Sequence, residues 1–378
     1  MKILVSGTAG GAGWPEPGCR CASCAGLPPG HRRPFELVVD GVARFPFDDP
    51  PSGYRACAGG LGLVGPDGSG LLCLPLGRPV PVDGPARYDV VLIDLLDRPE
   101  RLGELRRAGL ADDRTAVVAV GLDHRVRSEE ELARRLRLWG ARAVPDGTVL
   151  ETGRTPGTRP VPDGTVLETG RTPGTQAVSD GTVLETGRAP GTWPGGGCAR
   201  PGGPGTAPWR ALLLGGSRSG KSAEAELRLA AEPYVTYVAT GPSGAGDGEW
   251  AARVRAHRER RPAHWATVET ADLVSAIGQA TAPLLIDGLG TWLTAVFDEH
   301  GAWEGDRAPV RERCDELVAA WRRTPVRLVA VSDEVGMGVV PATSSGRAFR
   351  DALGRLNERL AAESEYVALV VAGRLLEL

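Results

Sequence analysis

Short apolar runs alternate with helix-forming segments along the C-terminal part of the chain, from residue 209 to residue 378. The apolar runs predict strands, and the segments between them predict helices. Because strands that alternate with helices usually join into a mostly parallel sheet covered on both faces, we expect an α/β fold here. The expected strands are 211–214, 234–240, 283–286, 326–332 and 366–372, and the expected helices are 223–231, 247–260, 271–279, 308–322 and 346–362.

A 17-residue unit runs three times in the middle of the chain, beginning at residues 144, 161 and 178. Each copy offers few apolar positions between its Pro, Asp and Gly residues, so the copies are poorly suited to stacking as a solenoid. We expect the first copy to close the N-terminal domain as a strand, and the rest to form a linker with the Gly/Pro-rich stretch that follows. The predicted division is therefore 1–150, 151–208 and 209–378.

Composition indicates a globular protein, with 42% hydrophobic residues and a net charge of −3. This charge argues against a nucleic-acid partner, and no apolar run approaches the roughly 18 residues that a membrane span needs. The first seven residues form too short an apolar stretch for a secretory signal and are typical of a first strand. The cysteines, seven in number and unevenly placed, do not form a disulfide framework. We expect a cytoplasmic protein.

Lysine occurs only at Lys2 and Lys221, although the chain has 44 basic residues. Lys221 completes the pattern G-x-x-x-x-G-K-S, which lies between an apolar run and a helix-forming segment. A strand, a glycine-rich turn and a helix bring backbone N–H groups and the positive end of a helix dipole around a polyphosphate. The predicted phosphate-binding loop consists of Gly215, Gly216, Ser217, Arg218, Ser219, Gly220, Lys221 and Ser222.

Several polar residues are expected near this loop, because ligands gather at the carboxyl ends of parallel strands. Lys221 would neutralise the terminal phosphates, and the Ser222 hydroxyl would hold Mg²⁺. Asp287 directly follows an apolar run, which is typical of a carboxylate that holds Mg²⁺ directly or through water. The alternative is that Asp287 caps the next helix.

A basic segment forms the second candidate site. The expected helix 247–260 ends at Pro262 and carries His257 near its C-terminal end, where several arginines crowd together. By itself this pattern favours a solvated basic helix end.

Seven segments, taken in order, resemble one family: the bifunctional adenosylcobinamide kinase/adenosylcobinamide-phosphate guanylyltransferases of cobalamin biosynthesis, which have a P-loop, RecA-like fold. The matching segments are 215–222, 237–240, 251–262, 265–270, 284–287, 333–341 and 349–360. The resemblance covers about 209–378 and implies two reactions. Adenosylcobinamide takes a phosphate from ATP or GTP, and GTP then guanylylates a histidine that passes GMP to adenosylcobinamide phosphate.

By motif position, the resemblance makes His257 the guanylylated histidine and Lys221 the second catalytic residue. The resemblance also implies a homotrimer. It implies that Glu269 and Asp287 contact guanine, ribose or the metal ion, and it leaves open which of the two residues contacts which group. The further nucleotide-binding residues that it implies are Ala239, Thr240, Gly241, Arg258, Glu259, Arg260, Arg261, Glu269 and Asp287. Two other functions fit the residues: a small-molecule kinase in which His257 is inert, and a nucleotide-binding regulatory protein.

The N-terminal part contains three thiols within six residues, Cys19, Cys21 and Cys24. They predict either a Zn²⁺ site with a fourth ligand elsewhere, for which His31 is a candidate, or unligated thiols. The start of the chain, together with 88–94 and 121–124, resembles the metallo-β-lactamase fold. Because no histidines pair at that fold's His-x-His-x-Asp-His spacing, we expect a smaller, degenerate and non-catalytic α/β domain.

Overall fold

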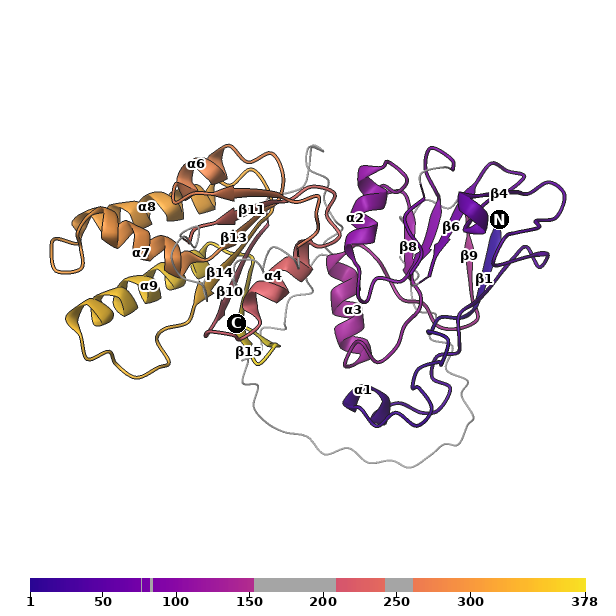
Figure 1. Ribbon diagram of the computed structural model, residues 1–378, viewed down its shortest axis with the longest axis horizontal. Helices are drawn as coiled ribbons and strands as arrows, with labels where there is room; N and C mark the ends of the chain where they lie inside the picture. Colours follow the sequence, from indigo (N-terminus) through magenta and orange to yellow (C-terminus); the bar gives the residue numbers. More distant parts are fainter. Residues whose placement is uncertain (76, 82–83, 153–208, 242–260) are drawn as a thin grey trace, which may run out of the picture.

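The computed structural model describes residues 1–75, 77–81, 84–152, 209–241 and 261–378. The described residues form two α/β halves that lie side by side, 1–152 and 209–378 (Figure 1). Two and a half of the 17-residue repeats, the Gly/Pro-rich stretch and the helix expected at 247–260 lie outside the described residues. The start of the first repeat is described and forms a strand, β9 (Thr148–Glu151), which pairs with the first strand of the chain, β1 (Lys2–Gly7).

The described C-terminal residues form a seven-stranded sheet in the order β12-β11-β13-β14-β10-β15-β16. Every neighbouring pair is parallel except β15 and β16, so the prediction of a mostly parallel α/β sheet is confirmed. The carboxyl ends of the six parallel strands consequently meet at one edge. The strands are β10 (Arg210–Gly215), β11 (Thr236–Ala239), β12 (Ala266–Glu269), β13 (Leu284–Asp287), β14 (Leu328–Asp333), β15 (Tyr366–Val371) and β16 (Arg374–Glu377).

Helices cover both faces of this sheet, as Figure 1 shows. One face bears α4 (Lys221–Leu229), and the other bears α6 (Leu273–Gly278), α7 (Leu289–Glu299), α8 (Ala308–Arg322) and α9 (Ser344–Ala362). Successive strand residues point to opposite faces. In β10, Leu212 therefore packs in the cluster under α6 to α9, whereas Leu213 packs in the cluster under α4.

Some elements differ from the expectation. The helix α9 begins at Ser344 rather than at residue 346, because the Thr343 side chain accepts a hydrogen bond from the Gly346 amide and caps the helix there. The elements α7, β12 and β16 were not predicted. All four residues of β12 are exposed, so this strand buries no side chain of its own and is held by its pairing with β11.

The N-terminal half contains two sheets that pack face to face. The first is antiparallel and has the order β3-β2-β1-β9, with β2 (Glu36–Val39) and β3 (Ala43–Arg44). The second has the order β4-β5-β6-β7-β8, and its last three strands are parallel. Its strands are β4 (Arg55–Cys57), β5 (Gly62–Val64), β6 (Gly70–Leu74), β7 (Val90–Ile93) and β8 (Ala116–Ala119).

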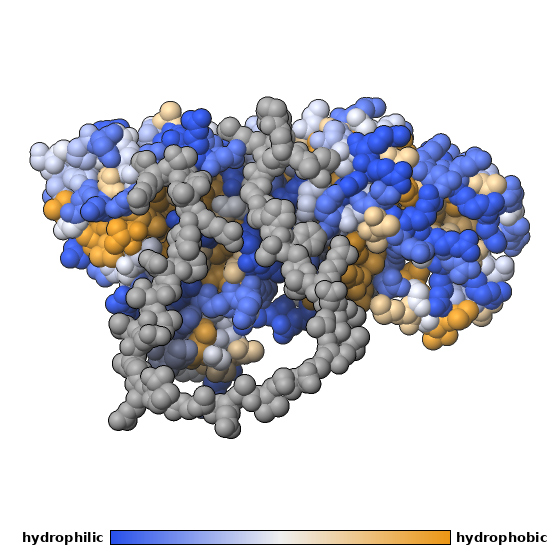
Figure 2. Space-filling model, turned by 180° about the vertical axis from the view of Figure 1, so that it is seen from behind, coloured by the Kyte–Doolittle hydropathy of each residue, from blue (hydrophilic) through white to orange (hydrophobic). Residues whose placement is uncertain are grey.

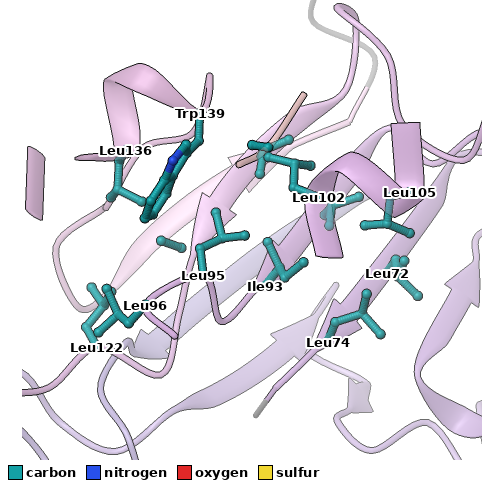
Figure 3. Close-up of a cluster of buried hydrophobic side chains, with 14 of the residues drawn as sticks. Leu72, Leu74, Ile93, Leu95, Leu96, Leu102, Leu105, Leu122, Leu136 and Trp139 are labelled. Carbon is teal, nitrogen blue, oxygen red and sulfur yellow. The ribbon is translucent and has the colours of Figure 1, made fainter. Parts of the chain in front are cut away.

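Two apolar clusters hold this half together. Inward residues of both sheets, such as Val5, Leu71 and Leu92, form the core between them. The outer face of the second sheet packs against α2 (Glu100–Arg107) and α3 (Glu129–Leu138), as Figure 3 shows for Ile93, Leu102 and other residues of this cluster. Residues 121–124, which contribute to the resemblance to the metallo-β-lactamase fold, form the loop after β8.

The two halves meet where α3 contacts α4 and where α2 contacts the residues just after α4 (Figure 1). The Trp139 indole N–H donates to the Leu227 carbonyl at 2.8 Å, and the Arg106 guanidinium donates to the Ala231 carbonyl at 2.8 Å. The Leu227 carbonyl lies in the last turn of α4 and also accepts from the Ala230 amide, and the Ala231 carbonyl lies two residues beyond the end of the helix. The N-terminal half therefore supplies hydrogen-bond donors to the end of the helix that begins at the phosphate-binding loop.

Hydrophilic residues dominate the visible surface of both halves, and the apolar residues on this face form separate patches (Figure 2). Across the described ranges, no helix has the length and apolar character needed to cross a membrane.

Candidate active site

The phosphate-binding loop has the geometry that its glycines predict. Gly220 adopts φ +99° and caps the N-terminus of α4, in a backbone region that other residues rarely enter. A Cβ at Gly215 would lie 2.6 Å from the Val370 carbonyl oxygen and from Ser219 Oγ. A side chain at Gly215 would therefore collide with β15 and with the loop itself, whereas at Gly220 the backbone conformation requires glycine. The open backbone faces a helix N-terminus, where anions bind.

Lys221 points across this loop toward the end of β14. Its Nζ lies 3.1 Å from the Gly216 carbonyl oxygen and 2.9 Å from Asp333 Oδ1. The Lys221 side chain is only 11% exposed, whereas that of Asp333 is 44% exposed. The ammonium is therefore held over the loop by groups whose place phosphate oxygens can take.

Ser222 and Asp287 come together from α4 and the end of β13. The Ser222 hydroxyl donates to Asp287 Oδ1 at 3.3 Å, and the Tyr237 hydroxyl donates to Asp287 Oδ2 at 2.6 Å. The two residues that the sequence predicts as Mg²⁺ ligands are therefore neighbours. The alternative that Asp287 caps the following helix is wrong, because Gly288 occupies the N-cap position of α7.

Tyr237 was not predicted to belong to the site. Its burial and the charge of Asp287 hold the pKa of its hydroxyl well above the usual range, so it remains protonated and donates. The Arg261 guanidinium lies 3.7 Å from the centre of the Tyr237 ring, a cation–π distance. Arg261 thereby lies beside the Asp287 cluster. The only sequence signal for Tyr237 was its place on the strand before Thr240.

Two threonines fix the turn after β13. The Thr240 hydroxyl donates to the Gly288 carbonyl oxygen at 2.6 Å and lies 2.6 Å from the Thr291 hydroxyl, which also contacts Gly288. Thr240 is 6% exposed and was expected near the phosphates. In the structure its hydroxyl is hydrogen-bonded to the protein backbone, so its side chain stabilises the turn that carries Asp287.

The end of β14 is fixed by a buried asparagine from α9. Asn357 is 4% exposed, accepts a hydrogen bond from Ser332 Oγ at 2.6 Å and donates to the Asp333 carbonyl oxygen at 3.1 Å. This arrangement sets the direction of the Asp333 side chain toward Lys221. The sequence indicates Asn357 only as a member of the matching segment 349–360. Its contact with Ser332 could not be predicted, because the two residues lie 25 positions apart in sequence.

The remaining predicted residues fall into two groups. Ala239 pairs with both Asp287 and Glu269 across the sheet, so Glu269 lies two strands from Asp287, at the exposed end of β12. Gly241 is the last described residue before a gap. His257, Arg258, Glu259 and Arg260 lie outside the described residues. His264, just before β12, places Nε2 3.3 Å from the Glu232 carbonyl oxygen, and burial lowers the pKa of its imidazole.

The N-terminal half holds its strand-end carboxylates differently. Asp94 follows β7 and is 2% exposed; its Oδ2 accepts from Arg125 at 2.9 Å. Arg125 also binds Asp97 at 2.7 Å and Asp123 at 2.8 Å. Burial raises the pKa of Asp94 despite this ion pair. The carboxylates at this edge are therefore tied to one arginine.

The fourth ligand proposed for the three N-terminal thiols needs correction. His31 places Nε2 2.8 Å from Glu129 Oε1, so its imidazole pairs with a carboxylate of α3. The imidazole beside the thiols belongs instead to His124, whose Nδ1 lies 3.6 Å from Cys24 Sγ. The sequence could not indicate this, because 100 residues separate the two.

Comparison with known proteins gives matches to the C-terminal half. Residues 211–378 match the family described as cobinamide kinase / cobinamide phosphate guanyltransferase. The chain is 41% identical over 174 residues to the bifunctional adenosylcobalamin biosynthesis protein CobU of Salmonella typhimurium, covering 43% of this chain and 95% of that protein. It is 42% identical over 172 residues to the protein CobP of the same description from Pseudomonas aeruginosa, covering 43% and 94%.

A third relative, CobU of Escherichia coli, is 38% identical over 177 residues, with 43% and 95% covered. Similarity to solved structures is weak by comparison. A chain described as a prototypical ATPase from the type III secretion system of pathogenic bacteria has a TM-score of 0.31 at 12% identity, over 43% of this chain and 50% of that one.

Proposed function

Because this chain belongs to the cobinamide kinase / cobinamide phosphate guanyltransferase family, we propose that residues 209–378 carry both activities of that family. The first is phosphorylation of adenosylcobinamide by ATP or GTP. The second is transfer of GMP from GTP to adenosylcobinamide phosphate, which gives adenosyl-GDP-cobinamide. The observation that carries the proposal is the convergence of Lys221, Ser222, Asp287 and Asp333 at one sheet edge.

For the kinase step, the γ-phosphate would lie against the loop amides and the N-terminus of α4. Lys221 would exchange its contacts with Gly216 and Asp333 for phosphate oxygens and would stabilise the charge that develops there. The substrate hydroxyl oxygen attacks the γ-phosphorus, the bond to the β–γ bridging oxygen breaks, and the nucleoside diphosphate leaves. The hydroxyl proton passes to solvent.

Ser222 and Asp287 fit a Mg²⁺ site, because a hydroxyl and a carboxylate oxygen 3.3 Å apart are hard oxygen donors beside the phosphate-binding loop. When bound, Mg²⁺ supplies charge neutralisation on the phosphates. Tyr237 supports this role by holding the second oxygen of Asp287 at 2.6 Å, which leaves Oδ1 directed at Ser222.

For the guanylyl transfer, we assign the nucleophile to His257 on the sequence match. Neutral imidazole is a good nucleophile near pH 7 and divides one transfer into two steps. An imidazole nitrogen attacks the α-phosphorus of GTP, and the bond to the α–β bridging oxygen breaks to release pyrophosphate. A phosphate oxygen of adenosylcobinamide phosphate then attacks the same phosphorus and breaks the P–N bond. Arg261 on Tyr237 supports a nucleotide position beside this segment.

A surface for the large corrinoid substrate lies in the loop after β14. Met337 is 73% exposed and Val339 is 95% exposed, although both are apolar. The loop is nevertheless held in place, because Arg350 donates to the Gly338 carbonyl oxygen at 3.2 Å and Glu334 accepts from the Gly336 amide at 2.6 Å. An anchored loop with exposed apolar side chains next to Asp333 favours contact with a large ligand that presents some apolar surface of its own.

The decisive test is incubation of the full chain with α-labelled GTP and Mg²⁺, followed by denaturing electrophoresis. We expect label that stays with the protein, is released by acid and is lost in His257→Ala. Phosphorylation of adenosylcobinamide should be largely spared in that variant. The matched control is His300→Ala, which alters an exposed histidine at the end of α7.

Three other outcomes separate the alternatives. Absence of label with intact phosphorylation would leave a small-molecule kinase, and absence of both with intact nucleotide binding would leave a regulatory protein. Equal loss of both activities in His257→Ala would indicate a structural role for that residue. The homotrimer implied by family resemblance is tested on the same preparation by light scattering, where a monomer mass would refute it.

A further inference from the structure

Three thiols and one imidazole converge in the N-terminal half, away from the proposed active site. Cys19, Cys21, Cys24 and His124 each place a ligand atom within 4.8 Å of all the others. The thiols come from the segment around α1 (Ala22–Ala25), whereas His124 comes from the loop after β8. Residues far apart in the sequence thus present the four soft or borderline donors that suit one metal ion.

The spacing agrees with a four-coordinate zinc site. Zinc binds thiolate sulfur at about 2.3 Å and imidazole nitrogen at about 2.0–2.1 Å, so tetrahedral angles place sulfur and nitrogen about 3.6 Å apart. The separation between Cys24 Sγ and His124 Nδ1 is 3.6 Å. A sulfur pair in the same geometry is about 3.8 Å apart, which lies within the 4.8 Å limit of the cluster.

The thiol segment is already ordered for ligation. The Cys24 amide donates to Cys21 Sγ at 3.5 Å, so Cys21 caps α1 through its sulfur. The Trp14 indole N–H donates to Ser23 Oγ at 3.2 Å, and both Trp14 and Cys24 are buried. These contacts fix the turn that directs Cys21 and Cys24 to one side.

The His124 loop is ordered by separate contacts. Arg125 donates its amide to Asp123 Oδ1 at 2.9 Å, and its guanidinium binds the same oxygen at 2.8 Å. His124 Nδ1 also lies 3.3 Å from Glu16 Oε2, so a carboxylate adds negative charge beside the thiols. The position of the imidazole therefore follows from the fold of the loop and does not depend on the thiols alone.

We propose that Cys19, Cys21, Cys24 and His124 bind one Zn²⁺ in a closed, tetrahedral structural site. The ion would join the segment around α1 to the loop after β8, with four protein ligands and no open position for catalysis. A closed site of this kind contributes to the stability of the N-terminal half rather than to chemistry. The proposal is independent of the activities proposed for residues 209–378.

The test uses the full chain, purified under reducing conditions and stripped with a chelator, then titrated with Co²⁺ alone. We expect one equivalent to bind and to give a sulfur-to-cobalt charge-transfer band with the intense ligand-field bands of four-coordinate Co²⁺. One equivalent of Zn²⁺ should displace the Co²⁺ and raise the Tm. No charge-transfer band, or a spectrum of six-coordinate Co²⁺, would overturn the proposal.

Matched variants then identify the ligands. His124→Ala should weaken Co²⁺ binding by at least about ten-fold and change the ligand-field bands. His31→Ala, which removes the other nearby histidine, should leave both unchanged. Cys21→Ser should lose most of the charge-transfer intensity, whereas Cys57→Ser, at a half-buried cysteine outside the cluster, should retain it.

Equal effects of His31→Ala and His124→Ala would contradict the assignment of the fourth ligand. A disulfide among the three thiols, found by mass spectrometry in the untreated protein, would contradict the metal site itself. Labelling with α-labelled GTP, run on the same samples, should be the same with and without Zn²⁺. Failure of one proposal is therefore distinguishable from failure of the other.

Discussion

Both halves of the molecule place aspartates where parallel strands end, but their partners differ. In the C-terminal half, Asp287 and Asp333 face a hydroxyl and an ammonium of the phosphate-binding loop. In the N-terminal half, Asp94 is buried against Arg125, which also binds two further carboxylates. The position of a carboxylate in an α/β fold is therefore a weak guide to function until its partners are known.

The largest expected effect comes from Lys221→Ala. It should lower kcat/KM for both activities by at least about 10²-fold, because both need the triphosphate on the same loop. Lys2→Ala, at the chain's other lysine, should have no effect. The measurement is cobinamide phosphorylation and protein guanylylation side by side. Kinase activity that survived in Lys221→Ala would refute the shared site.

Asp287→Asn tests the carboxylate of the C-terminal half. The amide keeps an acceptor for Tyr237 but loses the charge, so the Mg²⁺ concentration for half-maximal activity should rise about ten-fold or more. The control is Asp298→Asn, near the other end of α7. An unchanged Mg²⁺ dependence would show that Asp287 does not bind the metal ion and that, like Asp94, it has only a structural role. The proposed difference between the two halves would then be refuted.

Arg125→Ala tests the N-terminal half. Because the Asp94 side chain is 1% exposed, removing Arg125 leaves a buried carboxyl group without its ion-pair partner, and we expect about 3 kcal/mol of lost stability. Arg44→Ala, which breaks an exposed pair with Glu36, should cost less than about 1 kcal/mol. Urea unfolding measures both. If Arg125→Ala lost activity but kept its stability, the structural role assigned to Arg125 and Asp94 would be contradicted.

A smaller effect is expected at the contact between the halves. A Cβ at Gly103 in α2 would lie 2.7 Å from the Glu232 carbonyl oxygen, whereas a Cβ at Gly354 in α9 would contact nothing. Gly103→Ala should therefore lower the Tm by several degrees, and Gly354→Ala should leave it unchanged or raise it, since alanine favours helices. Equal Tm values for the two variants would mean that α2 is not closely packed against the Glu232 carbonyl group in solution.

Much of the C-terminal half could be predicted from the sequence, because its apolar runs and glycine pattern are local. The prediction of α8 at 308–322 was confirmed. The Mg²⁺-binding roles expected for Ser222 and Asp287 stay predictions, although their side chains do lie together. The helix α7 was missed because its sequence is rich in β-branched and aromatic residues, which favour strands. Its helical form depends on burial of Trp292, Val296 and Phe297.

The rest of the site depends on contacts that spacing does not encode. Tyr237 reaches Asp287 across two strands that lie 50 residues apart, and His124 approaches Cys24 across 100 residues. A histidine near a cysteine cluster in sequence, such as His31, is thus a poor predictor of the fourth ligand. Which histidine approaches the thiols is decided by the loop after β8, and that loop is positioned by tertiary structure.

The helix α4 has a further consequence, because its two ends belong to different halves. Its first residues belong to the proposed nucleotide site, and carbonyls in its last turn and just beyond it accept hydrogen bonds from Trp139 and Arg106. If nucleotide binding shifts this helix, nucleotide binding also changes the free energy with which the N-terminal half docks. Docking must then change the free energy of nucleotide binding by the same amount. A fragment that began at residue 209 would lose these donors, so the catalytic half of this protein is not interchangeable with its free-standing relatives.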